Sequence, residues 1–359
     1  MEPQKIKKPS HFQRLQVWVK AHKKWAIVLS ILLVLVIAGG VTAALSLILN
    51  TEPEAVQQVV VEPEPEPEPP KYYSPLTGEL VASEAITKQP VTGVMVENSP
   101  NARPQSGIKD AGIVFETVTE GGITRFLLLY QEDKPTLIGP VRSVRMAFVD
   151  WVAAFNASVA HVGGSYAALQ QLRNGSYRDI DQFFNAGTYW RATDRYAPHN
   201  VYTNFERLDA LNKAKGYTES TFTAFPRADL EEADELDATR ITVTMSGALY
   251  DSTYRYNAET GLYARSQGGE AHNDREKGRI SPKVVIIMEA PLRPDQITTI
   301  GKGNAYIFQN GSVTEGTWQK KSRTAQLTFT DAAGDPIELA RGQTWISAVP
   351  TSTGGVTWR

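Results

Sequence analysis

Arginine replaces lysine throughout one stretch of this 359-residue chain. Residues 135 to 212 contain no Lys and seven Arg, although the chain as a whole uses both types. The guanidinium fork binds carboxylate or phosphate with two hydrogen bonds, so the bias indicates an anion site. The alternative is ordinary ion pairing with the acids of the same region, which are Asp150, Asp179, Asp181, Asp194 and Glu206.

A polar set around these arginines forms the predicted ligand site. Arg142 and Arg145 stand three residues apart, just before an expected helix that starts at Met146. On a first helical turn they would share a face, and the backbone donors of the helix start would add to anion binding. The full predicted ligand-binding set is Arg125, Arg142, Arg145, His161, Arg191, His199 and Asn200.

Two residues of the region are candidate catalytic bases. Glu120 precedes a Gly-Gly turn, and His199 is one of three histidines beyond residue 22, the others being His161 and His272. Either could move a proton while nearby arginines stabilise developing anionic charge. The histidines lack close metal-ligand spacing, so we predict no metal and no cofactor. The absence of Cys excludes thiolate catalysis, disulfides and a lipid-modified cysteine.

The elements that must position these residues form a mixed α/β half over residues 72–235. Short apolar runs at 91–96, 113–118, 123–130 and 157–162 predict strands of a buried sheet. Helical spacing follows at 146–155 and 166–172. The candidate residues lie in or beside the loops at strand ends, where binding sites commonly form.

Residues 236–359 differ in character and predict a mostly antiparallel β half. Alternating stretches occur at 239–245, 253–265, 283–288, 304–308, 324–330 and 343–349. Asn310-Gly311 between two of them is typical of a tight hairpin. The fold class is therefore α+β, with a mixed half followed by a β-rich half, and the acidic stretch 225–237 is the expected seam.

The amino-terminal segment predicts a membrane anchor. Trp25 to Leu49 is 25 residues without a charge, long enough to cross a bilayer as a helix. Residues 1–24 carry seven Lys or Arg against one acid, which places this basic segment in the cytoplasm and the C-terminal domain outside. Residues 50–71 are rich in Glu and Pro and predict a disordered, extended stalk. A cleaved signal peptide is the alternative, but its apolar core would be shorter.

Several stretches in this order resemble the YerB-like family of bacterial envelope proteins, over residues of about 73 to 349. The stretches are Pro75–Gly78, Val94–Asn98 leading to Ser106-Gly107, Glu120–Phe126, Gly139–Ser143, Ala197–Asn200 and Gly342–Ile346. The resemblance implies a two-part α+β ectodomain and no known activity. Many members resemble lipoproteins, whereas this chain has a helix in place of a lipid-bearing Cys.

Three hypotheses for function follow. The first is a cell-membrane protein whose external domain binds an anionic cell-envelope component through the Arg and His residues. The second is an envelope hydrolase or a phosphotransferase, by a loose similarity to the LytR type. The third is a structural partner-binding protein. A net charge of -2 argues against nucleic acid as a partner.

Overall fold

The computed structural model describes residues 10–49, 70–231, 235–294 and 296–359. The chain divides into two compact units, residues 1–68 and 69–359, and each is described by itself. Most of the predicted Glu/Pro-rich stalk, residues 50–69, lies outside the described residues.

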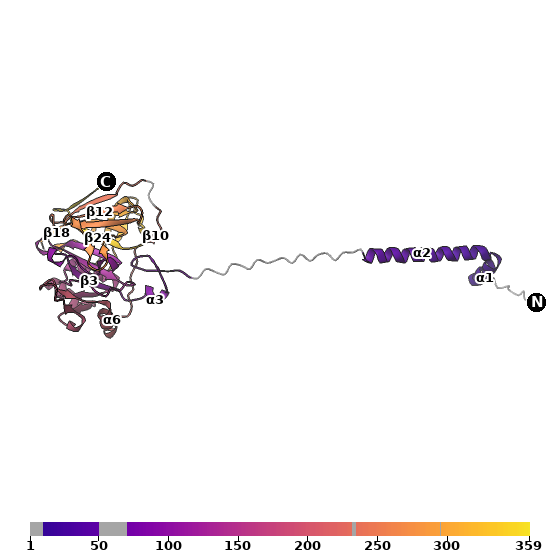
Figure 1. The fold of residues 1–359 in the computed structure, drawn as a ribbon, viewed down its shortest axis with the longest axis horizontal. Helices are drawn as coiled ribbons and strands as arrows, with labels where there is room; N and C mark the ends of the chain where they lie inside the picture. The colour runs from indigo at the N-terminus through magenta and orange to yellow at the C-terminus, as the bar shows by residue number, and fades with distance from the viewer. Residues whose placement is uncertain (1–9, 50–69, 232–234, 295) are drawn as a thin grey trace, which may run out of the picture. The chain divides into compact units, whose positions relative to one another are not determined.

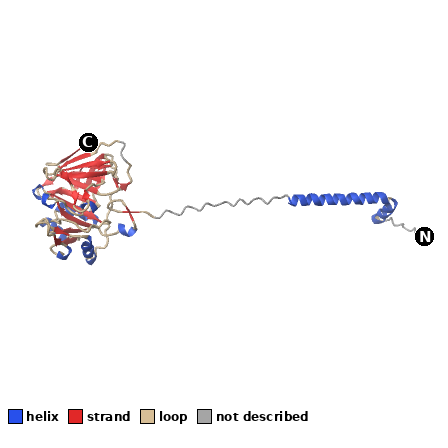
Figure 2. Cartoon of the chain, viewed as in Figure 1, coloured by secondary structure: helices blue, strands red, loops and turns tan. Residues whose placement is uncertain are grey.

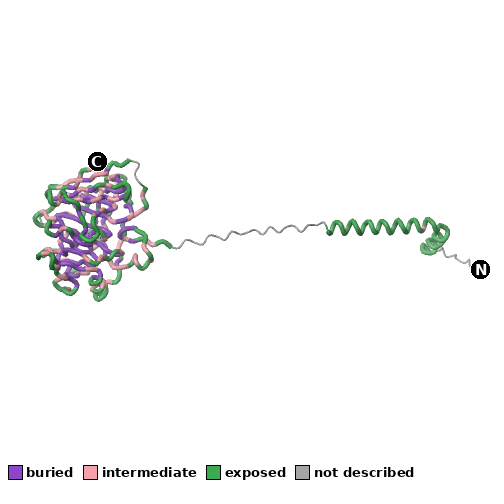
Figure 3. Tube along the Cα trace, viewed as in Figure 1, coloured by how far each residue is buried: buried purple, intermediate pink, exposed green. Residues whose placement is uncertain are grey.

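The first unit contains two consecutive helices. Helix α2 (Lys23–Leu49) includes the whole predicted apolar segment, has a mean hydropathy of 2.7 in its most apolar window and buries none of its residues (Figure 3). Among the described residues it is the one helix long and apolar enough to cross a membrane. Helix α1 (His11–Ala21) lies within the basic segment, where the sequence analysis predicted no helix.

The second unit is built on a ten-stranded mixed sheet, and Figure 2 shows strands making up most of its interior. Strands from both halves of the sequence lie side by side in it (Figure 1). In spatial order the strands are β22 (Thr328–Thr330), β21 (Ser312–Lys320), β20 (Gly301–Gln309), β17 (Val284–Ala290), β24 (Thr344–Pro350), β4 (Ile113–Val118), β5 (Thr124–Tyr130), β3 (Thr92–Glu97), β6 (Ser158–His161) and β7 (Arg178–Asp181).

Seven of these strands run in one direction: β21, which pairs antiparallel to β20, and the six strands that pair in parallel. β17, β24 and β4 pair in parallel, as do β3, β6 and β7, while β5 joins the two groups by pairing antiparallel to both β4 and β3. The carboxyl ends of the six strands therefore share one edge of the sheet. The amino end of β5 lies at that same edge.

Apolar layers cover both faces of the sheet, and Figure 3 shows the buried residues concentrated there. On one face, side chains of α4 (Met146–Val152) and α5 (Tyr166–Asn174) join the core. On the other face lie residues of α6 (Phe205–Ala214) and of a second, five-stranded sheet. The strand order of that sheet is β14 (Glu270–Ala271), β13 (Leu262–Gln267), β12 (Ser252–Asn257), β11 (Arg240–Thr244) and β25 (Gly355–Trp358).

Shorter elements complete the unit. One-turn helices are α3 (Glu84–Thr87), η1 (Pro100–Ala102), η2 (Ile108–Asp110), η3 (Glu120–Gly122), η4 (Ala153–Phe155) and η5 (Ala186–Thr188). Two-residue strands are β1 (Tyr72–Tyr73), β2 (Leu80–Val81), β8 (Trp190–Arg191), β9 (Val201–Tyr202), β10 (Arg227–Ala228), β15 (Asn273–Asp274), β16 (Gly278–Arg279), β18 (Leu292–Arg293), β19 (Gln296–Ile297) and β23 (Leu339–Ala340).

The α+β fold class is confirmed. Of the predicted strands and turns, some are confirmed and others differ in the structure. The hairpin at Asn310-Gly311 is present between β20 and β21, with both turn residues at positive φ. The stretch 253–265, predicted as one alternating segment, is instead the hairpin of β12 and β13. Gly261 at φ +66 sits in its turn, because that backbone conformation is strained for a residue with a Cβ.

A fully buried ion pair connects the two sheets. Glu116 of β4 accepts a hydrogen bond of 2.9 Å from Arg265 of β13, and neither side chain is exposed to solvent. Trp345 Nε1 also donates to Glu116, at 3.0 Å, and its ring lies 4.3 Å from the Arg265 guanidinium carbon. Removing one member of such a pair leaves a buried charge without its counterion.

We expect Arg265→Met to lower the free energy of unfolding by ~3–5 kcal/mol, because Glu116 would remain buried without its cation. Urea denaturation of the full chain in detergent measures the change. Arg255→Met, at an exposed position of the neighbouring strand, is the matched control. The double variant Glu116→Gln with Arg265→Met should recover much of the loss. Equal effects of the two single Arg variants would contradict this assignment.

Candidate functional site

The candidate site lies at the shared edge of the large sheet. Glu97 is the last residue of β3, and Glu120 follows the carboxyl end of β4 in the one-turn helix η3. Arg125, at the amino end of β5, pairs in register with Glu97 on one side and with Thr117 on the other. Because β3 and β4 run in the same direction on either side of β5, these charged residues of different elements lie at the same edge of the sheet.

Glu97 is the centre of the site. Its Oε2 lies 2.9 Å from His199 Nδ1 and 3.2 Å from Arg142 Nε. Ser99 Oγ donates to Oε1 of the same carboxylate at 2.9 Å. The Glu97 side chain is only 4% exposed, whereas those of Arg142 and His199 are 27% and 21% exposed. A buried carboxylate thus orients two partly exposed groups that can meet a ligand.

The contact with Glu97 fixes which nitrogen of His199 carries the hydrogen in the neutral ring. A carboxylate only accepts hydrogen bonds, so Nδ1 donates. Nε2 then keeps its lone pair, and it makes no hydrogen bond with any described residue. An imidazole held in this way can accept a proton or donate one to a ligand.

Arg145 forms an ion pair with Glu120. Burial raises the pKa of Glu120, but the hydrogen bond and charge of Arg145, with the charge of Arg125, lower it below its usual value overall. The prediction that Arg142 and Arg145 share a first helical turn is wrong. Arg145 is the extended residue before α4, and the segment ahead of it bonds to neighbouring strands instead, with Arg142 N–H donating to Met95 O.

Arg125 is buried and incompletely paired. It donates to Ser143 O at 2.8 Å, but its Nε has no hydrogen-bond partner among the described residues. Arg142 Nε is likewise unsatisfied, because its 3.2 Å approach to Glu97 lacks the angle of a hydrogen bond. Burial, reinforced by the charge of Arg145, lowers the pKa of Arg125 to about 10, so it is still a cation at neutral pH.

His161 is placed away from this cluster. It is fully buried, with Nε2 2.9 Å from Asp179 Oδ1 and Nδ1 2.8 Å from Gly163 O. Burial raises the pKa of Asp179, yet its hydrogen bond and charge interaction with His161 lower it overall. Both ring nitrogens of His161 are hydrogen-bonded within the fold. His161 therefore connects β6 to β7 and has no ring nitrogen left to bind a ligand.

Arg191 and Asn200 contact each other instead of joining the cluster. Arg191 donates to Asn200 Oδ1 at 2.8 Å, and the Asn200 amide donates to Ala192 O at 3.2 Å. Arg195 of the same loop donates to Ala102 O at 2.7 Å. These bonds close the loop between β8 and β9 and fix it to the segment after β3. Their effect is to position His199.

The structure therefore brings together Arg125, Arg142, Arg145, Glu120 and His199, and it leaves His161, Arg191 and Asn200 as supporting residues. Sequence analysis did not select Glu97 or Ser99 for the site. The available signal was their place in a polar loop directly after a buried strand. Nothing in the sequence spacing pairs Glu97 with a histidine about a hundred residues away.

A pocket of about 390 Å³ lies beside the segment that follows β3. Arg103 of that segment lines it, together with Gln267 and His272 among others. Arg265 donates to His272 Nδ1, so His272 Nε2 carries the hydrogen that bonds Gln105 Oε1 at 3.1 Å. Burial and the charge of Arg265 lower the pKa of His272 well below its usual value, and the ring stays neutral. Among the described residues, no group of three His, Cys, Asp or Glu could hold a metal ion.

Comparison with known proteins identifies two family domains in the chain. Residues 76–218 match the model described as "Protein of unknown function (DUF3048) N-terminal domain". Residues 241–346 match the corresponding C-terminal domain. The candidate cluster falls within the first of them.

One curated relative and one solved structure agree with this result. The chain is 33% identical over 293 residues to the Bacillus subtilis (strain 168) protein named "Putative lipoprotein YerB", covering 78% of this chain and 87% of the relative. The crystal structure of YerB from Bacillus subtilis matches with a TM-score of 0.72 at 30% identity, covering 80% of this chain and all of that one. The relative's name and the apolar helix α2 point to a membrane-anchored envelope protein. By its two domains and this relative, the chain belongs to the YerB-like, DUF3048 family of proteins of unknown function.

Proposed function

We propose that this chain is a single-pass membrane protein whose external unit binds an anionic component of the cell envelope at the cluster around Glu97. The observation that carries the proposal is the pair of unsatisfied guanidinium donors, Arg125 Nε and Arg142 Nε. Buried donors of folded proteins nearly always have a partner, and an unpaired one needs an explanation, of which a bound ion is one. An anionic oxygen is the acceptor that such donors prefer.

The charge balance of the cluster supports an anion. Three guanidinium groups, Arg125, Arg142 and Arg145, share two carboxylates, Glu97 and Glu120, and the charges of Arg142 and Arg145 act on Arg125. The excess is positive although the whole chain has a net charge of -2. A phosphate or carboxylate group would offset this excess of positive charge and accept hydrogen bonds from the unpaired N–H groups.

The proposed orientation follows from the amino-terminal unit. Helix α2 would cross the membrane, with the lysine-rich end in the cytoplasm and the family domains outside. An envelope polymer bearing phosphate or carboxylate groups would then be within reach of the external unit.

We expect Arg142→Gln with Arg145→Gln to weaken binding to isolated envelope fractions at least tenfold. The reason is that hydrogen bonds to charged groups contribute about 1.5–3 kcal/mol each and about 1.4 kcal/mol is tenfold in affinity. Sedimentation of the full chain in detergent with the envelope fraction measures it. The fraction is tested before and after mild acid removal of phosphodiester-linked polymer.

Arg255→Gln is the matched control, because Arg255 is an exposed residue of β12 in the second sheet and does not belong to the cluster. Its binding should equal that of the unmodified chain, and the melting temperature of the double variant should change by only a few degrees. Unchanged binding by the double variant would refute the anion site. A large loss of thermal stability would instead assign these arginines a structural role.

The Glu97–His199 contact favours a second function, an envelope hydrolase or phosphotransferase. A carboxylate that orients a histidine and leaves Nε2 free is the arrangement of a general base. Arg142 and Arg125 would stabilise the negative charge that develops at a carbonyl or phosphoryl group. Glu120 is a weaker candidate base than His199, because its ion pair with Arg145 lowers its pKa.

For this second function we expect the purified chain to release product from lipid-linked polymer or peptidoglycan fragments. His199→Ala should reduce the rate by about 10²–10⁴-fold, the usual contribution of a general acid or base. Chromatography of the reaction products measures the rate. Glu97→Gln should reduce it less, because the amide still accepts from Nδ1. Binding without turnover by the unmodified chain would support the binding function and contradict the enzymatic one. The absence of both binding and turnover would favour a structural, partner-binding protein.

A further inference from the structure

We propose that helix α1 lies along the surface of an anionic bilayer, with its apolar face in the membrane. This proposal rests on the membrane anchorage stated above. Five large apolar side chains of α1 are exposed, namely Phe12 (68%), Leu15 (57%), Val17 (69%), Trp18 (40%) and Val19 (40%). Four of them, all but Val17, recur on one face at helical spacing. At 100° per residue they cover about one third of the helix circumference.

The opposite face of α1 is mainly polar, and Val17 is its large apolar exception. Gln13, Gln16 and Lys20 lie on it at the same helical spacing. Residues 10–49 contain Arg14, Lys20, Lys23 and Lys24 and no Asp or Glu. An apolar face opposite a cationic face is the pattern of helices that bind the surface of membranes with anionic lipids.

Helix α1 has its own start and end, so it is not an extension of α2. Ser10 and Gln13 form a reciprocal capping box, in which Gln13 N–H donates to Ser10 Oγ and Ser10 N–H donates to Gln13 Oε1. The helix ends at His22, whose backbone leaves the helical region at φ -127 and whose ring stacks on Trp18. Because α2 starts at the next residue, α1 is held at the end of the membrane span.

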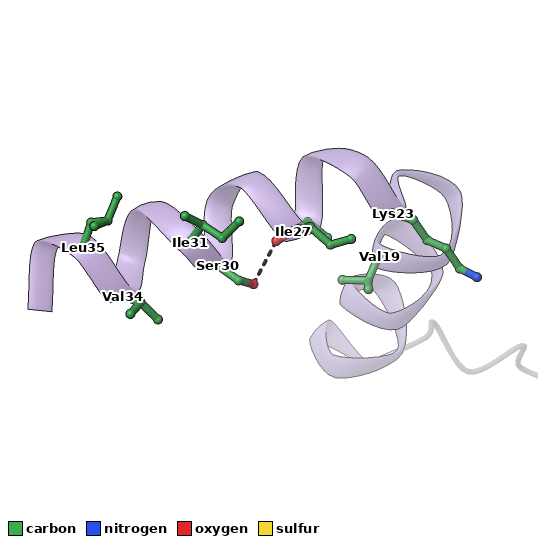
Figure 4. Close-up of a pocket in the computed structure, with 8 residues that line it drawn as sticks. Val19, Lys23, Ile27, Ser30, Ile31, Val34 and Leu35 are labelled. Carbon is green, nitrogen blue, oxygen red and sulfur yellow. Dashed lines mark hydrogen bonds between the residues drawn. The ribbon is translucent and has the colours of Figure 1, made fainter. Parts of the chain in front are cut away.

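The angle between the two helices leaves an apolar notch of about 550 Å³ (Figure 4). Val19 of α1 lines it together with Ile27, Ile31 and Val34 of α2, and Lys23 stands at the junction of the helices. A notch lined by such side chains is unfavourable in water. In a bilayer, acyl chains fill it, and the lysines beside it are placed to meet anionic headgroups.

Single-cysteine labels test the proposal cleanly, because the chain contains no Cys of its own. Leu15→Cys and Gln16→Cys are adjacent positions on the apolar and polar sides of α1, and Ile31→Cys reports on α2. Each full-length variant carries a nitroxide in nanodiscs of phosphatidylcholine, with or without phosphatidylglycerol. Collision with oxygen and with a water-soluble nickel complex gives the depth of the label.

With phosphatidylglycerol we expect the label at 15 to be protected from nickel at least fivefold more than the label at 16. Without the anionic lipid, or in the Arg14→Gln with Lys20→Gln background, that ratio should fall towards one. Equal exposure at 15 and 16 with a deep label at 31 would refute the surface helix and leave the anchor intact. Exposure at 31 would refute the anchor itself, and a ratio independent of lipid charge would refute the role of anionic headgroups.

Discussion

The buried carboxylate of Glu116 is the constraint on which the rest of the second unit depends. A charge fully removed from water is tolerated only if counterions and donors surround it. Arg265 and Trp345 supply those donors from the second sheet and from β24, so both must stay in contact with β4. One carboxylate therefore fixes the relative positions of strands that are far apart in the sequence.

The same network extends to the candidate site. Asn98 follows Glu97 directly, and its amide donates to Thr124 Oγ1 at 2.6 Å, while Thr124 donates in turn to Glu116. Gln105 donates to the backbone carbonyl of Glu97 at 3.0 Å. The segment that carries Glu97 is thus held through its neighbours. Rigid support of this kind keeps a charged site in place before a ligand arrives.

The sequence predicts the elements better than it predicts their partners. Apolar runs bounded by Gly and Pro locate β3, β4, β5 and β6, since strand burial depends on local residue type. The cluster around Glu97 is different, because its members come together only through the parallel pairing of strands and the folding back of a loop. Helix α1 is an intermediate case. Ser10 and Gln13 fit the capping-box pattern that indicates a helix start, whereas the basic residues of the segment indicate topology and not local structure.

The buried side chains of His161 and Arg125, at the same edge of the sheet, show why incomplete pairing points to function. His161 and Arg125 are both nine-tenths buried or more, and both would be costly without partners. His161 has acceptors at both nitrogens, so its role is complete within the fold. Among the described residues Arg125 donates to one carbonyl, although a guanidinium has five N–H donors. The charges of Arg145 and Arg142 oppose that of Arg125, while Glu120 and Glu97 partly offset them. A fold that satisfies His161 so fully could have done the same for Arg125 with one more acid. Unpaired donors beside a partly exposed histidine are the departure from local stability expected where a protein keeps hydrogen-bond donors for a ligand.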